Sequence, residues 1–467
     1  MIFGKGYNRI EEKFRYENQR KGRFLLQVKG KRGVMKEKKI LSILLVSFFM
    51  HSVVFALDLA GAGSDLSDAL GLGTNKNEGA TSFRSLLIPS GGRAEALGSA
   101  CTALCDGISF FDYNPAVSSV LKETETAVYH NAWIADSAIE TLSFTSRNGN
   151  FGYGAALKCF YVPFSEYNIR GERVSSAYYS ETTAVLNVSY NFLAGYYFKG
   201  IALGANAKVG WRNFPDYTDN KTDAVISGSG LSQSALALMA DFGALVRFNV
   251  LKKFQDREPN LCVGFSATSI GAALTGFGEG VELDDSLPSR LSLGVSWRFV
   301  RPVLISLEAR KEINVLSPSD SAGVGACAGV EVRVTDFFCV QSGFLLQGSS
   351  PRISLGGTAS FSRASVCACY TFDLTSSMNP VNHLSVSARL LLGDKGRAKI
   401  QELVDMYYIA GLRLYAQGNL DEAIRQWDMA ISLDKSFDPA LEAKSAAVRF
   451  ADAKNDIMDM QRFDVSH

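Results

Sequence analysis

Apolar and polar residues alternate along most of this chain, from about residue 124 to residue 392. The stretch LSLGVSWRF (291–299) places Leu291 and Leu293 on one side of an extended strand and Ser292 on the other. Alternation of period two marks a strand whose two sides meet different surroundings, but it does not say whether the apolar side meets a protein core or lipid. The connections between strands have to decide this.

About fourteen segments show the pattern, and most have the roughly ten-residue length that a tilted membrane-spanning strand needs. They are residues 124–133, 137–146, 150–161, 178–192, 199–211, 235–249, 259–270, 288–298, 302–310, 323–333, 336–347, 351–361, 364–372 and 383–392.

The connections between these segments alternate in length, with exceptions at residues 134–136 and 348–350. Short ones such as RNGN, FVR and TD take turns with long ones such as PFSEYNIRGERVSSA and NFPDYTDNKTDAVISGSGLSQS. An up-and-down barrel with short turns at one end and longer loops at the other produces this alternation, whereas a Greek-key sandwich has no reason to. The sequence therefore predicts an all-β transmembrane barrel of about 14 antiparallel strands over residues 123–393. In it Leu291 faces lipid and Arg298 faces the lumen, and a soluble sandwich is the alternative.

One long apolar run lies near the N-terminus, whereas a helical membrane protein would show such runs repeatedly. Three lysines precede it and small residues follow it, so residues 35–56 are predicted to be a signal peptide cleaved after Ala56. An uncleaved anchor helix is the alternative. Residues 1–34 carry no fold pattern, and we interpret them as an upstream extension, with Met35 as the true start. The formal net charge of +1 argues against nucleic acid as a partner.

Residues 57–122 precede the first strand and are rich in Gly, Ala and Ser. They are too apolar for a free tail and too short for a domain, which favours a plug inside the barrel. A helix is expected over residues 92–106. A turn follows in DYNPA, because Pro115 restricts Asn114 to an extended conformation.

Eight cysteines and four histidines are present, without any C-x-x-C pair, so neither a zinc site nor another metal or cofactor is expected. Cys327 and Cys339 lie in neighbouring strands, where they either pair as a disulfide or serve as small apolar filler, which is favoured. A disulfide between Cys101 and Cys105 would be strained within a helix.

Residues 394–467 change to a helical period. The 34 residues 404–437 fit a helix-turn-helix with the spacing of a tetratricopeptide (TPR) repeat, followed by a helix that Pro439 opens. Tyr407 and Gly411 on the first helix and Trp427 on the second form the contact faces and are the candidate partner-binding residues. A generic helical hairpin is the alternative. One repeat is too little for independent stability, so this segment should dock on the barrel, dimerise or bind a periplasmic protein.

The stretch GGRAEALGSACTALCDGISFFDYNPA (91–116), with NPA at Asn114–Ala116, and the fourteen-strand pattern after it resemble the FadL-type family of outer-membrane transporters for long-chain fatty acids. The layout looks closest to FadL-like paralogues of treponemal spirochaetes. The resemblance covers about residues 85–392, and the TPR-like tail departs from the best-known members. It implies a plug, bearing the NPA motif, that shifts to pass a hydrophobic ligand through the barrel wall.

The resemblance implies an apolar track with a cationic end for a carboxylate. The candidates in the plug are Phe110, Phe111 and Tyr113 for the track, with Asn114, Pro115 and Ala116 as the plug motif. Arg93 and Arg298 are the candidates for the cationic end, and inward-facing Arg310 and Arg389 are further ones. A surface capture groove is expected in connections 162–177 and 212–234.

Passive uptake of long-chain fatty acids or other hydrophobic nutrients across the outer membrane is therefore the first functional hypothesis. The second is a docking protein that recruits envelope or secretion partners through its tail. An enzyme is the weakest, because a lipase needs a Ser/His or comparable dyad and no G-x-S-x-G elbow is present. His130 and His383 lie in the first and last strands, which are neighbours in a closed barrel, and inward polar filler is the favoured interpretation of both.

Overall fold

The computed structural model describes residues 81–465, apart from residues 168–169, 220–221, 223, 276, 278–281, 316–320, 348–349 and 375–381. The predicted upstream extension (1–34), the predicted signal peptide (35–56) and the first part of the predicted plug lie outside the described residues. Among the described residues, no helix is both long and apolar enough to cross a membrane.

The described part of the chain contains fifteen strands. They are β1 (Thr124–Ala132), β2 (Ala138–Asn148), β3 (Phe151–Tyr167), β4 (Arg173–Ala194), β5 (Lys199–Asn213), β6 (Ala235–Phe248), β7 (Leu261–Thr275), β8 (Glu282–Ser286), β9 (Pro288–Val300), β10 (Val303–Asn314), β11 (Val324–Arg333), β12 (Phe338–Gln347), β13 (Ser350–Ser360), β14 (Ala364–Asp373) and β15 (His383–Gly393).

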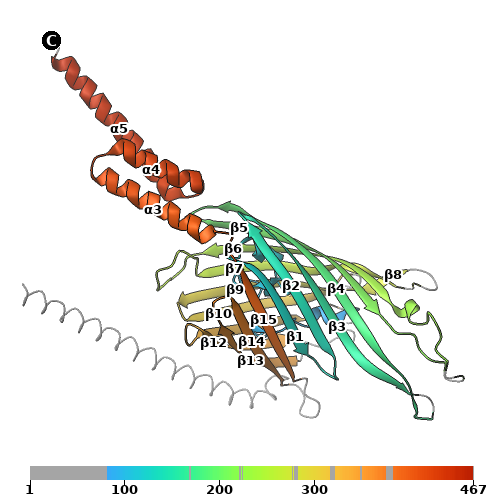
Figure 1. Cartoon of the computed structure of the whole chain (residues 1–467). Coiled ribbons are helices and arrows are strands. Elements are labelled where there is room, and N and C mark those ends of the chain that lie inside the picture. The colour runs from blue at the N-terminus through green and yellow to red at the C-terminus, as the bar shows by residue number, and fades with distance from the viewer. Residues whose placement is uncertain are drawn as a thin grey trace, which may run out of the picture. The chain divides into compact units, whose positions relative to one another are not determined.

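Fourteen of these strands close into a barrel (Figure 1). Each strand pairs antiparallel with the next along the chain, β7 pairs with β9, and β1 closes the ring on β15, with His130 opposite Val386. The fourteen predicted strands are confirmed. The sequence pattern missed β8, a short strand that pairs only with the far end of β7 and lies outside the ring.

The antiparallel order places the short turns, the start of β1 and the end of β15 at one end of the barrel, called here the short-turn end. The longer connections lie at the opposite end, the loop end (Figure 1). The predicted loop 162–177 is wrong over most of its length. Strands β3 and β4 continue through it as a paired hairpin, because residues such as Phe164 and Ala177 remain in register. Glu166 in this hairpin accepts hydrogen bonds from the Thr218 backbone N–H (3.0 Å) and hydroxyl (2.7 Å).

The apolar side of the strands faces outward and the polar side faces the lumen. Leu293 is 56% exposed, whereas its neighbours Ser292 and Ser296 are buried. This polarity is the reverse of a soluble barrel, whose exposed face would be polar, so the outer surface fits a lipid environment. The predicted orientation of residues 291–299 is confirmed, and Arg298 reaches an acidic residue inside the barrel.

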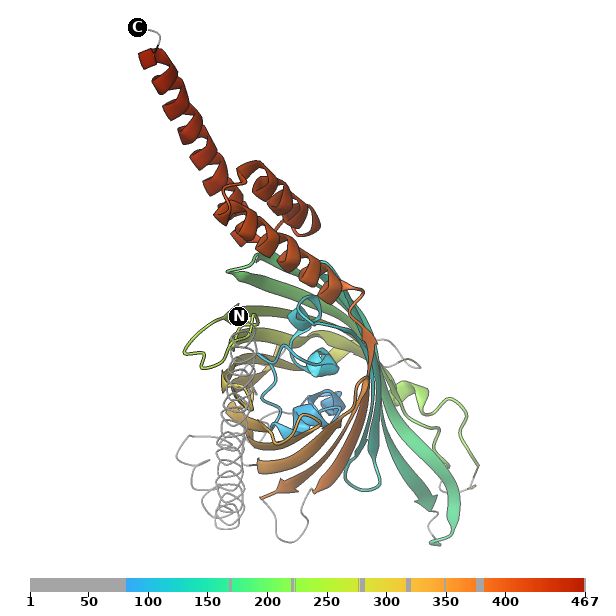
Figure 2. The ribbon, with the colours of Figure 1, turned by 60° about the vertical axis from the view of Figure 1, so that its left-hand side comes forward.

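Four short helices lie inside the ring of strands (Figure 2). They are η1 (Arg84–Leu87), α2 (Arg93–Ala96), η2 (Ile108–Asp112) and η3 (Pro115–Ser119), and the described residues 81–122 that contain them are called the plug here. The predicted helix over 92–106 is wrong. It ends after one turn because Gly98 and Ser99 both take positive φ angles (62°), which a helix cannot contain.

Three helices follow the barrel: α3 (Arg397–Ala416), α4 (Leu420–Leu433) and α5 (Asp438–Val465). The predicted hairpin is present, although α3 begins before the predicted repeat. Gly411 lies against the buried Trp427, where a larger residue would overlap the indole ring, and the Trp427 Nε1–H donates to the Tyr408 carbonyl at 3.3 Å. The identity of this hairpin as a TPR repeat stays a prediction.

The helical tail contacts a short turn of the barrel. Tyr196, between β4 and β5, stacks edge-on against Phe437 (5.1 Å between ring centroids), and its N–H donates to the Asp438 carboxylate at 3.0 Å. Arg257, in another turn at the same end, pairs with Asp405 of α3 at 2.7 Å. The sequence left three possibilities for the tail: docking on the barrel, dimerisation or binding of a periplasmic protein. These contacts show docking on the barrel.

We predict that Leu293→Lys destabilises the protein in lipid vesicles by about 2–4 kcal/mol, because it places a charge on the lipid face midway along β9. Val225→Lys is the matched control, since Val225 is equally exposed (60%) but lies in the β5–β6 connection. Chemical unfolding in vesicles measures both. Equal effects of the two substitutions would contradict a lipid-facing β9.

Candidate functional site

The plug backbone lies directly against glycines of the barrel wall. An added Cβ at Gly204 (β5) would overlap the Pro115 carbonyl, and one at Gly243 (β6) would overlap the Asn114 side chain. Other inward glycines meet plug backbone in the same way: Gly152, Gly264, Gly329 and Gly343. These missing side chains let the chain cross the lumen in contact with its wall.

The NPA motif is seated by its own polar groups. The Asn114 amide donates to the carbonyls of Thr102 (2.7 Å) and of Ala244 in β6 (3.1 Å), and its Oδ1 accepts from the Ala116 N–H at 3.1 Å. The Pro115 carbonyl accepts from the Asn187 amide of β4 at 3.0 Å. Asn114 thus caps η3, while Pro115 fixes the first turn, and the motif joins two parts of the plug to the wall.

An ion-pair network holds the plug at the short-turn end. Arg93 bonds Glu331 of β11 through its Nε (2.5 Å) and Nη2 (3.1 Å), and its Nη1 bonds Asp106 at 2.8 Å. Arg298 of β9 reaches Asp106 at 3.5 Å. Arg389 of β15 donates to the Asp106 backbone carbonyl at 3.2 Å.

Burial raises the pKa of the Asp106 carboxyl, but the charges of Arg93, Arg298 and Arg389 lower it more, so this pKa lies well below its usual range. A depressed carboxyl pKa contributes stability at neutral pH that is lost only as the pH falls through the folded-state value. The Asp106 carboxylate is therefore charged at neutral pH and can pair with these arginines.

A second anchor lies on β10. The Glu308 carboxylate accepts the backbone N–H groups of both Cys101 and Thr102 at 2.9 Å, and Arg310 pairs with Glu308 at 3.0 Å. The Arg310 Nη2 also donates to the Ser99 carbonyl at 2.7 Å. The Glu308–Arg310 ion pair of the wall thus bonds the plug backbone at residues 99–102, where the predicted helix over 92–106 does not form.

His383 contacts the plug and not His130. Its Nε2 bonds Glu95 of α2, which also receives the Thr371 hydroxyl of β14 at 3.3 Å. His130 lies on the outer face and pairs with Glu140 at 2.7 Å. The two histidines are therefore not brought together. The interpretation as inward polar filler fails for His130, because Asn131 and not His130 takes the inward position.

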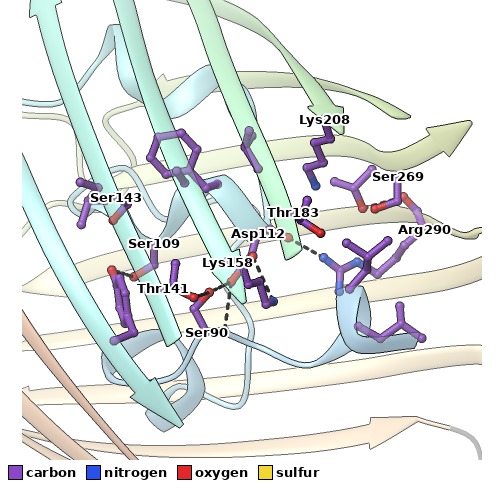
Figure 3. A pocket seen from close by; sticks show the side chains of 18 of the residues that line it. Ser90, Ser109, Asp112, Thr141, Ser143, Lys158, Thr183, Lys208, Ser269 and Arg290 are labelled. Carbon is purple, nitrogen blue, oxygen red and sulfur yellow. Dashed lines mark hydrogen bonds and ion pairs between the residues drawn. The ribbon is translucent and has the colours of Figure 1, made fainter. Parts of the chain in front are cut away.

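A cavity of about 30 Å³ lies between the plug and strands β1–β5, β7 and β9 (Figure 3). The Lys158 Nζ on its wall donates to the Ile88 carbonyl (2.5 Å) and lies 3.5 Å from the Asp112 carboxylate. Arg290 donates to the Asp112 carbonyl at 2.7 Å (Figure 3). Lys208 pairs with buried Asp241 at 2.7 Å. Three cations and the Asp112 carboxylate thus line a polar space behind the plug.

A larger cavity of about 780 Å³ opens above the plug near the loop end, and it is called the vestibule here. Apolar rings and cations line it together. Its aromatic residues are Phe83, Trp133, Phe160 and Tyr179, and its arginines are Arg84, Arg212, Arg310 and Arg352. Glu95, Glu181, Glu312 and His383 add polar groups. Such a mixture suits a ligand with an apolar body and an acidic end.

Arg352 lines the vestibule beside an aromatic ring. Its guanidinium lies over the Trp133 ring, 5.4 Å from the centroid, and its buried Nε has no hydrogen-bond partner among the described residues. The sequence reasoning missed Arg352 and Trp133 as site residues. The available signal was their position, since both lie near strand ends at the loop end of the barrel.

Phe110 and Phe111 stack on each other (4.3 Å between centroids) in the buried core of the plug, and Phe111 also lines the small cavity. Tyr113 is buried beneath Arg290, whose guanidinium lies 5.7 Å from the ring centroid. The structure thus places the predicted track inside the plug and the predicted cations in ion pairs that hold it. Their roles toward a ligand stay predictions.

The cysteines carry no disulfide, and all eight are free thiols. The suggested Cys327–Cys339 bridge is wrong because Cys327 lies opposite Leu345 and Cys339 opposite Arg333. The interpretation of Cys327 as apolar filler fits its burial. In the described residues, no group of three or more His, Cys, Asp or Glu side chains could hold a metal ion.

The model of the family described as "Uncharacterised protein family (UPF0164)" matches residues 61–395. The chain belongs to this family. One UPF0164 protein of Treponema pallidum (strain Nichols) is 31% identical over 417 residues, covering 85% of this chain and 88% of the relative. A second from the same organism is 28% identical over 410 residues, covering 82% and 78%. The predicted similarity to treponemal proteins is confirmed.

Solved structures of similar fold include the CymD monoaromatic hydrocarbon channel, with a TM-score of 0.44 and 13% identity over 66% of this chain and 98% of CymD. A FadL homologue of Pseudomonas aeruginosa gives a TM-score of 0.38 and 12% identity over 65% of this chain and 97% of its own. Membership of this chain in the FadL-type family stays a prediction.

We predict that Gly204→Ala loosens the plug, because the added methyl overlaps the Pro115 carbonyl and the wall cannot yield. Overpacking of this kind costs about 1–3 kcal/mol. The matched control is Gly357→Ala in β13, where a methyl meets only the edge of the Phe338 ring. Limited proteolysis of the plug in detergent measures the effect. Equal protection of the plug from proteolysis in the two variants would contradict the close contact between the plug backbone and Gly204.

Arg93→Gln should destabilise the protein by about 3 kcal/mol, because it leaves Glu331 buried without its counter-charge. Arg425→Gln is the control, since Arg425 forms a solvent-exposed pair with Glu422 on α4 and should have little effect. Chemical denaturation compares the two. A loss for Arg93→Gln no larger than that for Arg425→Gln would show that the network does not anchor the plug.

Proposed function

We propose that this protein is an outer-membrane channel for passive uptake of long-chain fatty acids or closely similar hydrophobic acids. The observation that carries the proposal is the vestibule, in which aromatic rings and arginines lie together above a plug that fills the lumen. The apolar outer surface supports a place in the membrane, and the predicted signal peptide supports export to it.

The vestibule offers a fatty acid two complementary surfaces. The Trp133 and Phe160 rings provide apolar contact, and the free Nε–H of Arg352 provides a charge-assisted donor for a carboxylate. A neutral hydrocarbon would use only the rings. The acidic amphiphile is therefore the ligand class that uses both features.

Passage beyond the vestibule requires the plug to move. Phe110 and Phe111 are buried in the closed state and would line an apolar path once η2 shifts from the wall. The ligand carboxylate would then replace the Asp106 carboxylate as the partner of Arg93 and Arg298 at the short-turn end. The Asp106 side chain is 44% exposed. An exchange of one carboxylate for another preserves the charge balance, which keeps the barrier to transfer low.

The last strand of the barrel, β15, ends at the short-turn end, and the helical tail follows it there. The usual arrangement of outer-membrane barrels puts short turns in the periplasm, so the tail helices are proposed to be periplasmic. The proposed domain order is an upstream extension (1–34), a signal peptide (35–56), a plug (57–122), a barrel (123–393) and a periplasmic helical segment (394–467).

A docking role through this tail is the second candidate. Met406 and Ile409 on α3 and Val448 and Phe450 on α5 are exposed apolar residues, which could bind a periplasmic protein. Tyr407, Gly411 and Trp427 were the predicted contacts. Because Trp427 and Gly411 are buried within the hairpin, they would act by holding it in shape. Deleting residues 396–467 without any effect on uptake would separate this role from transport.

Uptake of a labelled long-chain fatty acid into liposomes carrying the refolded protein tests the transport proposal, with a sugar of similar mass as the control. We expect entry of the fatty acid and not of the sugar. Arg352→Gln should lower fatty-acid uptake about tenfold, the equivalent of one lost charge-assisted hydrogen bond, and leave uptake of the methyl ester of that acid unchanged.

Two results would contradict the proposal. If neither the fatty acid nor the sugar enters the liposomes, the docking role becomes the favoured proposal. An equal loss of acid and ester in Arg352→Gln would show that the vestibule does not recognise the carboxylate. Asn114→Ala removes two donors to carbonyls and one cap, so unchanged uptake in that variant would count against a moving plug.

A further inference from the structure

Two cysteines meet where the plug passes the wall of the barrel at the short-turn end. The Cys105 Sγ of the plug lies 3.3 Å from the Cys262 Sγ of β7. Among the described residues this is the one close contact between two thiols. Cys262 is the second residue of β7, faces the lumen and is buried, whereas Cys105 is partly exposed.

The backbone on both sides of Cys105 is held in place. On one side, the Ala103 carbonyl accepts from the Ser296 hydroxyl at 2.8 Å, and Ser296 lies directly opposite Cys262 in the β7–β9 ladder. Two residues further along β7, Gly264 lets the Thr102–Ala103 backbone approach the strand. On the other side, Asp106 is bound by Arg93. The two thiols are therefore held together by contacts that do not involve sulfur.

The chemistry of the pair favours reaction with a disulfide. Because the hydrogen bond with Cys262 outweighs burial, it lowers the pKa of the Cys105 thiol, which makes Cys105 the attacking group. A disulfide bond is about 2.05 Å long, so small side-chain rotations close the remaining distance. Cys105 is itself partly exposed and is adjacent to the partly exposed Asp106.

We propose that Cys105 and Cys262 are a disulfide-forming pair that locks the plug to strand β7. The oxidant is a small-molecule or protein disulfide. The Cys105 thiolate attacks one sulfur of that disulfide and releases the other as a thiolate, which leaves a mixed disulfide on Cys105. The Cys262 thiolate then attacks the Cys105 sulfur and releases the second thiol. Both cysteine protons pass to the oxidant, which ends as two thiols.

The lock acts on the part of the plug that has to move. A Cys105–Cys262 bond ties the segment between the Glu308 anchor and η2 to the wall, and the non-covalent contacts around it can then break without releasing the plug. The reduced pair leaves only those contacts. The redox state of the compartment thus sets whether the plug is fixed or free to shift.

Thiol mapping of the folded protein tests the bond itself. The purified barrel in detergent is treated with oxidised glutathione or with a reductant, alkylated with N-ethylmaleimide and digested without reduction. We expect the peptides containing residues 105 and 262 to be joined after oxidation and separate after reduction. Alkylation of both cysteines after oxidation, or glutathione retained on Cys105 alone, would overturn the proposal.

Limited proteolysis of the plug tests the lock, and it needs no ligand and no transport. Oxidation should slow plug cleavage at least several-fold in the wild type and in Cys339→Ser, a control at a half-buried cysteine of β12 with no thiol neighbour in the described structure. It should have no effect in Cys105→Ser or Cys262→Ser. A joined peptide without slower cleavage would refute the lock while leaving the uptake proposal untouched.

Discussion

A barrel with an apolar outer face presents its polar side chains to its own interior, where each needs a partner because a buried unpaired polar group costs about 1–3 kcal/mol. In this protein the plug supplies many of those partners. Glu308 receives two backbone N–H groups of the plug, Asn187 donates to a plug carbonyl, and His383 bonds the plug's Glu95. The plug thus provides hydrogen-bond partners for polar side chains that the barrel turns toward its lumen.

The same constraint bears on the proposed release of the plug. Glycines such as Gly204 and Gly264 bring the plug backbone to the wall without interlocking side chains. Many of the contacts that remain are hydrogen bonds and ion pairs, which water or another polar group can replace once the plug shifts. Apolar plug side chains such as Val117 also share a buried cluster with wall residues such as Val185, and exposing that cluster to water would carry a cost.

Charge placement divides the lumen into three levels. Arginines at the short-turn end are bound to Asp106, Glu331 and Glu125 and hold the plug. Lys158 and Lys208 at the middle level are neutralised by Asp112 and Asp241. The vestibule above them carries Arg352, whose buried Nε has no hydrogen-bond partner among the described residues and lies beside the Trp133 ring. In the proposed function, the free donor lies where a ligand arrives first, and the paired cations lie where they hold the plug.

The period-two pattern and the lengths of the connections together determined the fourteen strands, their order and the side that each presents outward, because alternation and loop length depend only on local sequence. The tail hairpin was equally readable, since Gly411 and Trp427 follow a helical period. Tertiary structure alone decided the partners inside the barrel. Glu95 meets His383 and Cys105 meets Cys262 only because the strands close into a ring around the plug. No local pattern encodes such contacts, since they join residues separated by more than a hundred positions.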